Sequence, residues 1–270
     1  MIVKVPNFIE NYRAKAKYAK DIHQLAGRGT WRPLTEFINT RLCQELRIGQ
    51  DDQVVDIGCG DGTLLRMAAA LGVKQATGLC ATEEEASRLS ATGLNAAQGY
   101  TDNLPLADSC ASVVVSNSVL VIVPRNKIPA SLREMARIAM PGARIWVGEI
   151  PYKLEGGGDP RHTSVLSMLW WLLRKRGLRT FLGKCRQLLV AAIQREPIIL
   201  NAAPPVEFYA APEEFIQLAK DAGLTLVRQL PTQFLDHQGS VITSDSRRDY
   251  LFARTTFQTP DSISSHHAHS

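Results

Sequence analysis

The chain has 270 residues, a formal net charge of +5, 45% hydrophobic residues and 21% charged residues. This length suits one large α/β domain with an elaborated cap, and the ordinary composition excludes collagen-like and disordered classes. Five cysteines are scattered without a CxxC pair, which excludes a disulfide framework and a zinc site of the usual spacing. Because no charged region followed by an apolar run marks a secretory signal, we expect a cytoplasmic protein.

The first 50 residues are expected to be helical. Residues 11–25 are rich in Ala, Lys and Tyr, and residues 34–46 carry an apolar stripe with helical spacing. We interpret residues 1–50 as a lid over a ligand site, with the loop Gly27 to Pro33 as its hinge. Ordinary core and surface positions remain the alternative for the lid candidates Tyr12, Tyr18, Trp31 and Arg32.

Strands and helices then alternate, which predicts a parallel sheet with right-handed crossovers and a ligand outside the carboxyl ends of its strands. We assign residues 51–155 and 205–257 to this core. The expected strands are residues 53–57, 75–79, 95–98, 112–116, 144–150, 224–228 and 250–253. The expected helices are residues 63–71, 83–91, 129–139 and 212–222.

Residues 156–204 interrupt this pattern and are predicted to be an inserted helical cap that is both basic and apolar. From Arg161 to Arg195 there are eight Lys or Arg residues and no Asp or Glu, and two tryptophans lie among leucines just before the basic cluster. Two interpretations stay open: an interfacial helix that places residues 164–195 at the inner face of a membrane, or a helix pair packed on the core. The mostly aliphatic residues between the charges argue against a nucleic-acid surface. The tail 258–270 is expected to be disordered.

The most informative segment runs from Asp56 to Gly62 with the spacing Asp-x-Gly-x-Gly-x-Gly. An apolar strand that ends in an acid and is followed by glycines favours a close backbone approach to a ligand. The dinucleotide fingerprint G-x-G-x-x-G does not fit, because the third glycine comes one residue early. A carboxylate at Asp56 would also repel a pyrophosphate and suits a cationic ligand.

This segment resembles motif I of the class I S-adenosylmethionine-dependent methyltransferases. Three further segments resemble the same family in the same order: Asn103 to Leu120, Leu132 to Arg144, and Pro212 to Arg228. The resemblance implies a Rossmann-like, doubly wound α/β fold with a seven-stranded sheet. It also implies S-adenosyl-L-methionine as cofactor and S-adenosyl-L-homocysteine as product.

The resemblance places the cofactor along the carboxyl ends of the first, second and fourth strands of the core. The glycine segment would wrap the methionine and ribose, Asp102 would accept from the adenine amine, and Asn117 would face the same cleft. The alternative for Asp102 is a residue that only caps a turn. The candidate cofactor-binding residues are Asp56, Gly58, Cys59, Gly60, Gly62, Cys80, Ala81, Asp102, Asn103, Leu104 and Asn117.

Cys80 departs from the family pattern, in which the second strand ends in an acid that binds both ribose hydroxyls. A thiol is a poor acceptor, so three explanations stay open: affinity is lower, a neighbour such as Thr82 or Glu83 replaces the acid, or the nucleoside site has drifted. This departure motivates a second hypothesis, a non-catalytic binding protein that uses its basic cap to dock on a membrane or a partner. An RNA methyltransferase ranks third.

For the reaction, we expect methyl transfer to a small or lipid-linked acceptor at oxygen. Base N-methylation is disfavoured because Asn117-Ser118-Val119-Leu120 stands where the Asn/Asp-Pro-Pro-aromatic motif would be. A hydroxyl acceptor benefits from a general base, and the candidates are Glu149 at the end of the fifth strand and His162 after the glycine linker, with His237 behind them. Each of these three has a structural role as its alternative. No metal is expected.

Overall fold

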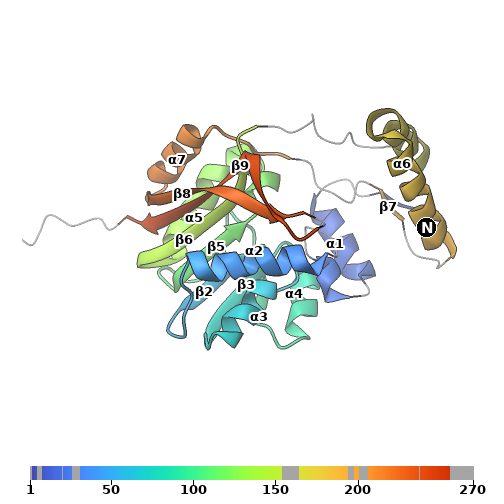
Figure 1. Ribbon diagram of the computed structural model, residues 1–270. Helices are drawn as coiled ribbons and strands as arrows, with labels where there is room; N and C mark the ends of the chain where they lie inside the picture. The colour runs from blue at the N-terminus through green and yellow to red at the C-terminus, as the bar shows by residue number, and fades with distance from the viewer. Residues whose placement is uncertain are drawn as a thin grey trace, which may run out of the picture.

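A seven-stranded mixed sheet forms the centre of the described chain (Figure 1). The computed structural model describes residues 2–4, 8–19, 21–25, 31–153, 164–193, 198–200, 206–236 and 238–255. The strand order is β4-β3-β2-β5-β6-β9-β8. These strands are β2 (Gln53–Ile57), β3 (Gln75–Cys80), β4 (Ala96–Gln98), β5 (Ala111–Asn117), β6 (Ala139–Pro151), β8 (Leu224–Leu235) and β9 (Val241–Arg254).

Five strands of the sheet are parallel, and the hairpin at one edge is antiparallel. Strands β2, β3, β4, β5 and β6 pair in parallel, whereas β9 runs antiparallel to both β6 and β8. The order turns around between β2 and β5, since the chain moves outward to β4 and returns to the other side of β2. Ligands of open α/β sheets bind at such a switch point. The expected doubly wound, seven-stranded fold is confirmed.

Alternating side chains of the central strands face two helical layers. Val54, Val113 and Trp146 pack with α2 and α3, while Val55, Val114 and Ile145 pack with α5 and α7. Both faces are buried because parallel strands with crossover helices are covered on both sides. The helices around the sheet are α2 (Arg32–Glu45), α3 (Thr63–Ala70), α4 (Glu83–Ser90), α5 (Ile128–Ile138) and α7 (Pro212–Asp221), with short 3-10 turns η2 (Leu120–Ile122) and η3 (Arg125–Lys127).

The N-terminal elements differ in what they cover. Helix α1 (Phe8–Tyr18) is followed by the 3-10 turn η1 (Ile22–Leu25), where one continuous helix was expected. Helix α2 belongs to the core, because its Ile38 and Leu42, and Leu46 just after its end, are buried in one cluster with side chains of the sheet. Of the expected hinge from Gly27 to Pro33, residues 27–30 lie outside the described residues and the last two residues already belong to α2. The division into lid, core, cap and tail stays a prediction.

Helix α6 (Val165–Ile193) lies to one side of the sheet, beyond α1 in the view of Figure 1. It is two helices joined at Gly177, whose φ of 83° and ψ of 171° break the helical path. The strand that follows, β7 (Ile198–Leu200), pairs in parallel with β1 (Ile2–Lys4) in a separate two-stranded sheet. In this view α6 lies apart from the core. Its role as an interfacial helix or as a helix pair packed on the core stays a prediction.

Candidate functional site

The loop after β2 has a shape that requires glycine. Gly58 has a φ of 74°, and a Cβ there would lie 2.4 Å from Cγ2 of Val119. Gly62 also has a positive φ, 76°, and serves as the N-cap of α3. Side chains with a Cβ are strained in this conformation, so the sequence places glycines where the chain turns from strand to helix. The result is a tight loop that leaves the space above the carboxyl end of β2 open.

A cavity of about 590 Å³ occupies this space, at the ends of β2, β3 and β5. Helix α1, η1 and α2 contribute Ile9, Tyr12, Leu25 and Thr35 to its wall. Eight predicted cofactor-binding residues line it together: Asp56, Gly58, Cys59, Gly60, Cys80, Ala81, Asp102 and Asn117.

Three predicted residues do not line this cavity. Gly62 lies behind the loop, where an added Cβ would meet Leu94 of the core. Asn103 closes a turn by donating its N–H to the carbonyl of Tyr100. Leu104 is buried, and its N–H donates to Glu134 Oε2 at 2.8 Å. These three residues hold the loops that border the cavity. Direct contact with a cofactor stays a prediction for all eleven residues.

Cys80 lies at the end of β3 with its sulfur 3.5 Å from that of Cys59. The hydrogen bond between these thiols, together with burial, raises the pKa of Cys59 well above its ordinary value. The Cys59 thiol therefore stays protonated near neutral pH. A thiol is a poor hydrogen-bond acceptor, so neither cysteine replaces the carboxylate that the family carries at this position.

Glu85 is the acid that sequence reasoning missed. It is buried and lines the cavity, whereas Glu83 is exposed. The hydroxyl of Thr82 accepts from the Glu85 N–H at 3.3 Å, which caps the start of α4, and donates to Glu85 Oε2 at 3.1 Å. The Thr82-x-x-Glu85 spacing was the available signal, but it indicates a helix cap and gives no sign of a cavity wall.

The cavity wall also contains an ion pair, Asp102 with Lys127, and the phenol of Tyr12. Asp102 Oδ2 lies 2.8 Å from Nζ of Lys127, and both residues line the cavity. Burial, helped by the nearby charge of Glu85, raises the pKa of Tyr12 to about 12. Tyr12 is therefore a neutral hydrogen-bonding group at physiological pH.

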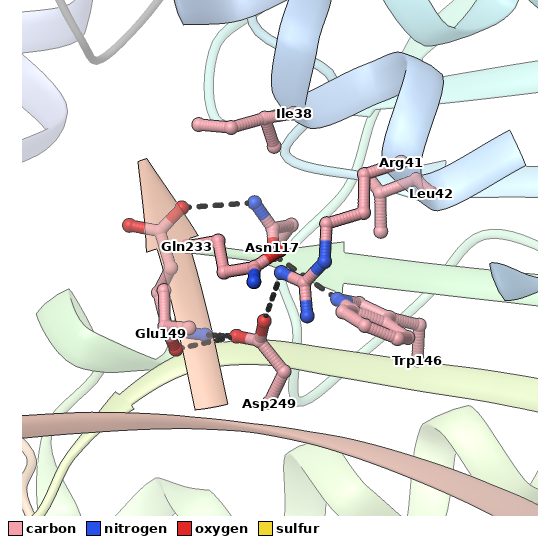
Figure 2. A pocket seen from close by; sticks show the side chains of 9 residues that line it. Ile38, Arg41, Leu42, Asn117, Trp146, Glu149, Gln233 and Asp249 are labelled. Carbon is pink, nitrogen blue, oxygen red and sulfur yellow. Dashed lines mark hydrogen bonds and ion pairs between the residues drawn. The ribbon is translucent and has the colours of Figure 1, made fainter. Parts of the chain in front are cut away.

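Glu149, a predicted catalytic residue, is buried beside the large cavity, in the wall of a smaller one of about 10 Å³ (Figure 2). Its φ is 62°, a conformation that is uncommon for residues other than glycine. The amide of Asn117 donates to Glu149 Oε1 at 3.0 Å, and Arg247 lies 3.6 Å from Oε2. Asn117 and Arg247 both line the large cavity, so they separate Glu149 from it.

A second network holds the backbone of Glu149 in place. Asp249 accepts from the Glu149 N–H at 2.8 Å, from the Thr232 hydroxyl at 2.7 Å and from Arg41 at 2.7 Å (Figure 2). Arg41 also lies over the ring of Trp146, 5.6 Å from its centroid. These contacts join α2, β6 and β9, and they provide the surrounding structure that a strained φ requires. The other predicted base, His162, and the weaker candidate His237 lie outside the described residues.

His23 and Asp61 form a pair that the sequence did not indicate. His23 Nδ1 lies 2.8 Å from Asp61 Oδ2, and Asp61 also accepts from the N–H and the hydroxyl of Thr63. Asp61 lines both the large cavity and a neighbouring one of about 350 Å³, whose wall includes His23 and Arg66. Within the described residues no cluster of three or more metal-ligating side chains occurs, and no helix is long and apolar enough to span a bilayer.

The central region of the chain is similar to a known protein family. Residues 55–147 match the family model described as "Methyltransferase domain". No curated protein sequence matches the chain significantly. The matched region contains all eleven predicted cofactor-binding residues, from Asp56 to Asn117.

Many solved structures share the fold. A SAM-dependent methyltransferase from Methanosarcina mazei superposes with a TM-score of 0.51 at 18% identity, covering 79% of this chain and 97% of its own. A Haloferax volcanii putative methyltransferase, solved with the Trm112 methyltransferase activator, gives a TM-score of 0.55 at 17% identity and covers 93% and 100%. A possible histamine N-methyltransferase from Thermotoga maritima gives 0.52 at 16% identity and covers 91% and 100%. At these identities the structures show the fold, and with the family match they confirm the resemblance to class I methyltransferases.

Proposed function

From the methyltransferase domain that residues 55–147 carry, we propose that the protein transfers the methyl group of S-adenosyl-L-methionine to an oxygen atom of a small or lipid-linked acceptor. The observation that carries this proposal is the cavity of about 590 Å³ at the switch point of the sheet. Its volume lies within the range of about 300–1,000 Å³ that is typical of ligand pockets.

The residues of this cavity fit the cofactor. Val119 packs so closely against Gly58 that there is no room for a Cβ at this position. The backbone of the glycine loop therefore forms the floor of the cavity. The wall offers the acceptors that the cofactor needs: Asp56 for its ammonium group, Glu85 for the ribose hydroxyls and Asp102 for the adenine amine. When bound, the cofactor supplies a methyl group on a sulfonium, which is already an excellent leaving group.

The protein then has to align the acceptor and exclude water. Val121, Ile122 and Val123 give the cavity an apolar side near η2, and Ile9 and Tyr12 close it from α1. A hydroxyl acceptor must also lose a proton. Glu149 is a proposed base that reaches the cavity only through Asn117 and Arg247, and His162 remains the second proposed base.

The Cys59–Cys80 pair supports one alternative, a methyltransferase-fold protein that binds a partner without catalysis. Two thiols stand where a ribose acid would otherwise be, and a thiol is a poor hydrogen-bond acceptor, which weakens the argument for tight cofactor binding. The alternative predicts no measurable affinity for the cofactor or its product.

Calorimetric titration with S-adenosylmethionine and S-adenosylhomocysteine separates the two functions. We expect both to bind, and Asp56→Asn to lose at least about tenfold in affinity because a charge-assisted contact is worth about 1.5–3 kcal/mol. Asp51→Asn is the matched control, since Asp51 is exposed before β2. Absence of binding at high micromolar ligand by a folded protein would rule out the methyltransferase and favour the alternative.

A further inference from the structure

Helix α6 presents apolar side chains to solvent along two rows. In its first half, Leu166, Trp170 and Leu173 lie one or two turns apart, so they share one face. In its second half, Leu178, Leu182, Leu189 and Ile193 share a face in the same way. The exposures are high: 78% for Leu166, 60% for Trp170 and 73% for Ile193. Soluble proteins rarely leave such a surface uncovered.

Basic side chains flank these rows. Six Lys or Arg residues and no acid lie between Val165 and Ile193. Arg174 and Arg179 are exposed and lie about a quarter turn from the centres of the apolar rows at the helical period, whereas the exposed Arg186 lies at the edge of the second row, four residues after Leu182. The Arg174 guanidinium lies over the ring of Trp170, 4.6 Å from its centroid, so one side chain pair combines charge and apolar surface.

From this arrangement we infer that α6 is a docking surface for an anionic lipid bilayer, lying in the interface without crossing it. Leucines and a tryptophan beside a basic rim are what an interfacial helix needs, with the apolar row in the acyl boundary and the charges at the headgroups. The break at Gly177 lets two short helices meet the same plane at different angles. This inference does not depend on the reaction, and it gives a lipid-linked acceptor a reason to be near the protein.

Charge argues against the other occupants. Two copies of α6 packed on each other would bring twelve like charges together, since each carries six basic residues and no acid to neutralise them. A nucleic acid would match the charge but would leave the exposed leucine and isoleucine side chains in water. An anionic bilayer satisfies both features together.

The position of α6 is also suitable. The strand after it, β7, pairs with β1, which immediately precedes α1 in the chain. Helix α1 contributes Ile9 and Tyr12 to the wall of the large cavity, and Figure 1 shows α6 on the same side of the molecule as α1. A bilayer that contacts α6 would therefore approach the α1 side of the cavity.

Sedimentation of the full chain with vesicles tests the inference. We expect strong binding to equimolar phosphatidylglycerol and phosphatidylcholine and little to phosphatidylcholine alone. Binding should weaken as salt rises from ~0.1 M to ~1 M, because the screening length falls from about 10 Å to about 3 Å. Equal binding to both vesicle types, or none to either, would overturn the inference.

Two α6 variants separate charge from apolar burial. Arg174→Gln, Lys175→Gln and Arg179→Gln together should lower the vesicle partition coefficient at least about tenfold, since each basic residue near the surface contributes. Leu166→Ser, Trp170→Ser and Ile193→Ser together should lower it by a similar factor and remove the blue shift of tryptophan fluorescence on binding.

The matched control removes the same charge from the core surface: Lys74→Gln, Arg133→Gln and Lys220→Gln, all at exposed positions. It should bind vesicles as the unmodified protein does. A control that loses binding as much as the α6 charge variant would overturn the inference in favour of net charge alone. An apolar variant that keeps vesicle binding but turns a dimer into a monomer would overturn it in favour of a second copy. Cofactor titration on every variant keeps this result separate from the proposed reaction.

Discussion

Strand β5 and helix α6 are both rich in apolar side chains, yet the fold treats them in opposite ways. Val113 and Val114 of β5 are fully buried, whereas Leu166 and Trp170 of α6 are mostly exposed. The difference lies in the layers around them. Neighbouring strands and helices on both faces enclose β5, while the described core leaves the outer rows of α6 uncovered. Apolar composition therefore predicts burial only where the topology supplies a second layer, and otherwise it indicates a surface for something outside the chain.

The largest expected effect comes from placing a charge in each region. Val114→Asp should lower the free energy of unfolding by more than about 4 kcal/mol, because the carboxylate would be buried without a partner. Leu166→Asp should change it by no more than about 0.5 kcal/mol, since the side chain is already in solvent. Urea unfolding followed by circular dichroism measures both. Comparable destabilisation by the two variants would show that α6 packs like a core element.

The second prediction concerns the glycine loop. Gly58→Ala combines a positive φ with a Cβ 2.4 Å from Val119. We therefore expect the free energy of unfolding to fall by about 2–3 kcal/mol and cofactor binding to be lost. Gly93→Ala is the control: Gly93 has a φ of 83° but nothing within 4 Å of an added Cβ. It should cost only about 1 kcal/mol and leave binding unchanged. A Gly58→Ala protein that titrates normally with S-adenosylhomocysteine would contradict the proposed floor of the cavity.

The third prediction tests whether Glu85 serves where Cys80 does not. Glu85→Gln keeps an acceptor for the Thr82 hydroxyl but removes the charge from the cavity wall, so we expect affinity for S-adenosylhomocysteine to fall about tenfold. Glu84→Gln, which removes an exposed pair with Arg13, should leave affinity within about twofold. Equal affinities for the two variants would show that Glu85 is only a helix cap.

The smallest expected effect is a pH dependence from Tyr12. Its pKa is raised from 10.0 to about 12 in the folded chain, so the folded state holds its proton more tightly than the unfolded state. The stability that this phenol contributes is present below pH 10 and is lost as pH rises toward 12. Between pH 10 and pH 12 the free energy of unfolding of Tyr12→Phe should fall less than that of the unmodified protein. We expect a difference of about 1 kcal/mol, because the ring is only half-buried. Unfolding curves between pH 8 and pH 12 measure it, and identical slopes in both proteins would refute the assignment.

The sequence predicted the elements whose signal is local. Strand β2 was predicted at both of its ends, because an apolar run closed by Asp56 and Gly58 leaves little freedom. The glycine loop and four wall residues, Asp56, Gly58, Cys59 and Gly60, followed from the same motif, and the other four predicted wall residues came from the family resemblance. Strand β9 was predicted only from Tyr250, although it begins at Val241. Its first half is polar, and its pairing with β8 in a long hairpin holds it in the sheet, which no local pattern indicates.

The parts of the site that sequence reasoning missed depend on tertiary contacts. Glu85 has the spacing of a helix cap and performs that role, and only the packing of α4 beside β3 brings it to the cavity. His23 and Asp61 are far apart in the chain, and only the packing of η1 against the glycine loop brings them together. Glu149 was expected to face the cleft, but its backbone is held by Asp249, a contact between residues a hundred positions apart.

The pairing of β1 with β7 has a practical consequence for dissecting this protein. Ile2 is in register with Ile198, so the second residue of the chain is joined by backbone hydrogen bonds to the segment that follows α6. Excising α6 together with β7 would therefore leave the N-terminal strand without its partner, and a truncated protein would report on two lesions at once. The segment after α6 and the N-terminal strand are thus structurally coupled through the β1–β7 pairing. Point substitutions on the surface of α6 change the helix without disturbing that pairing.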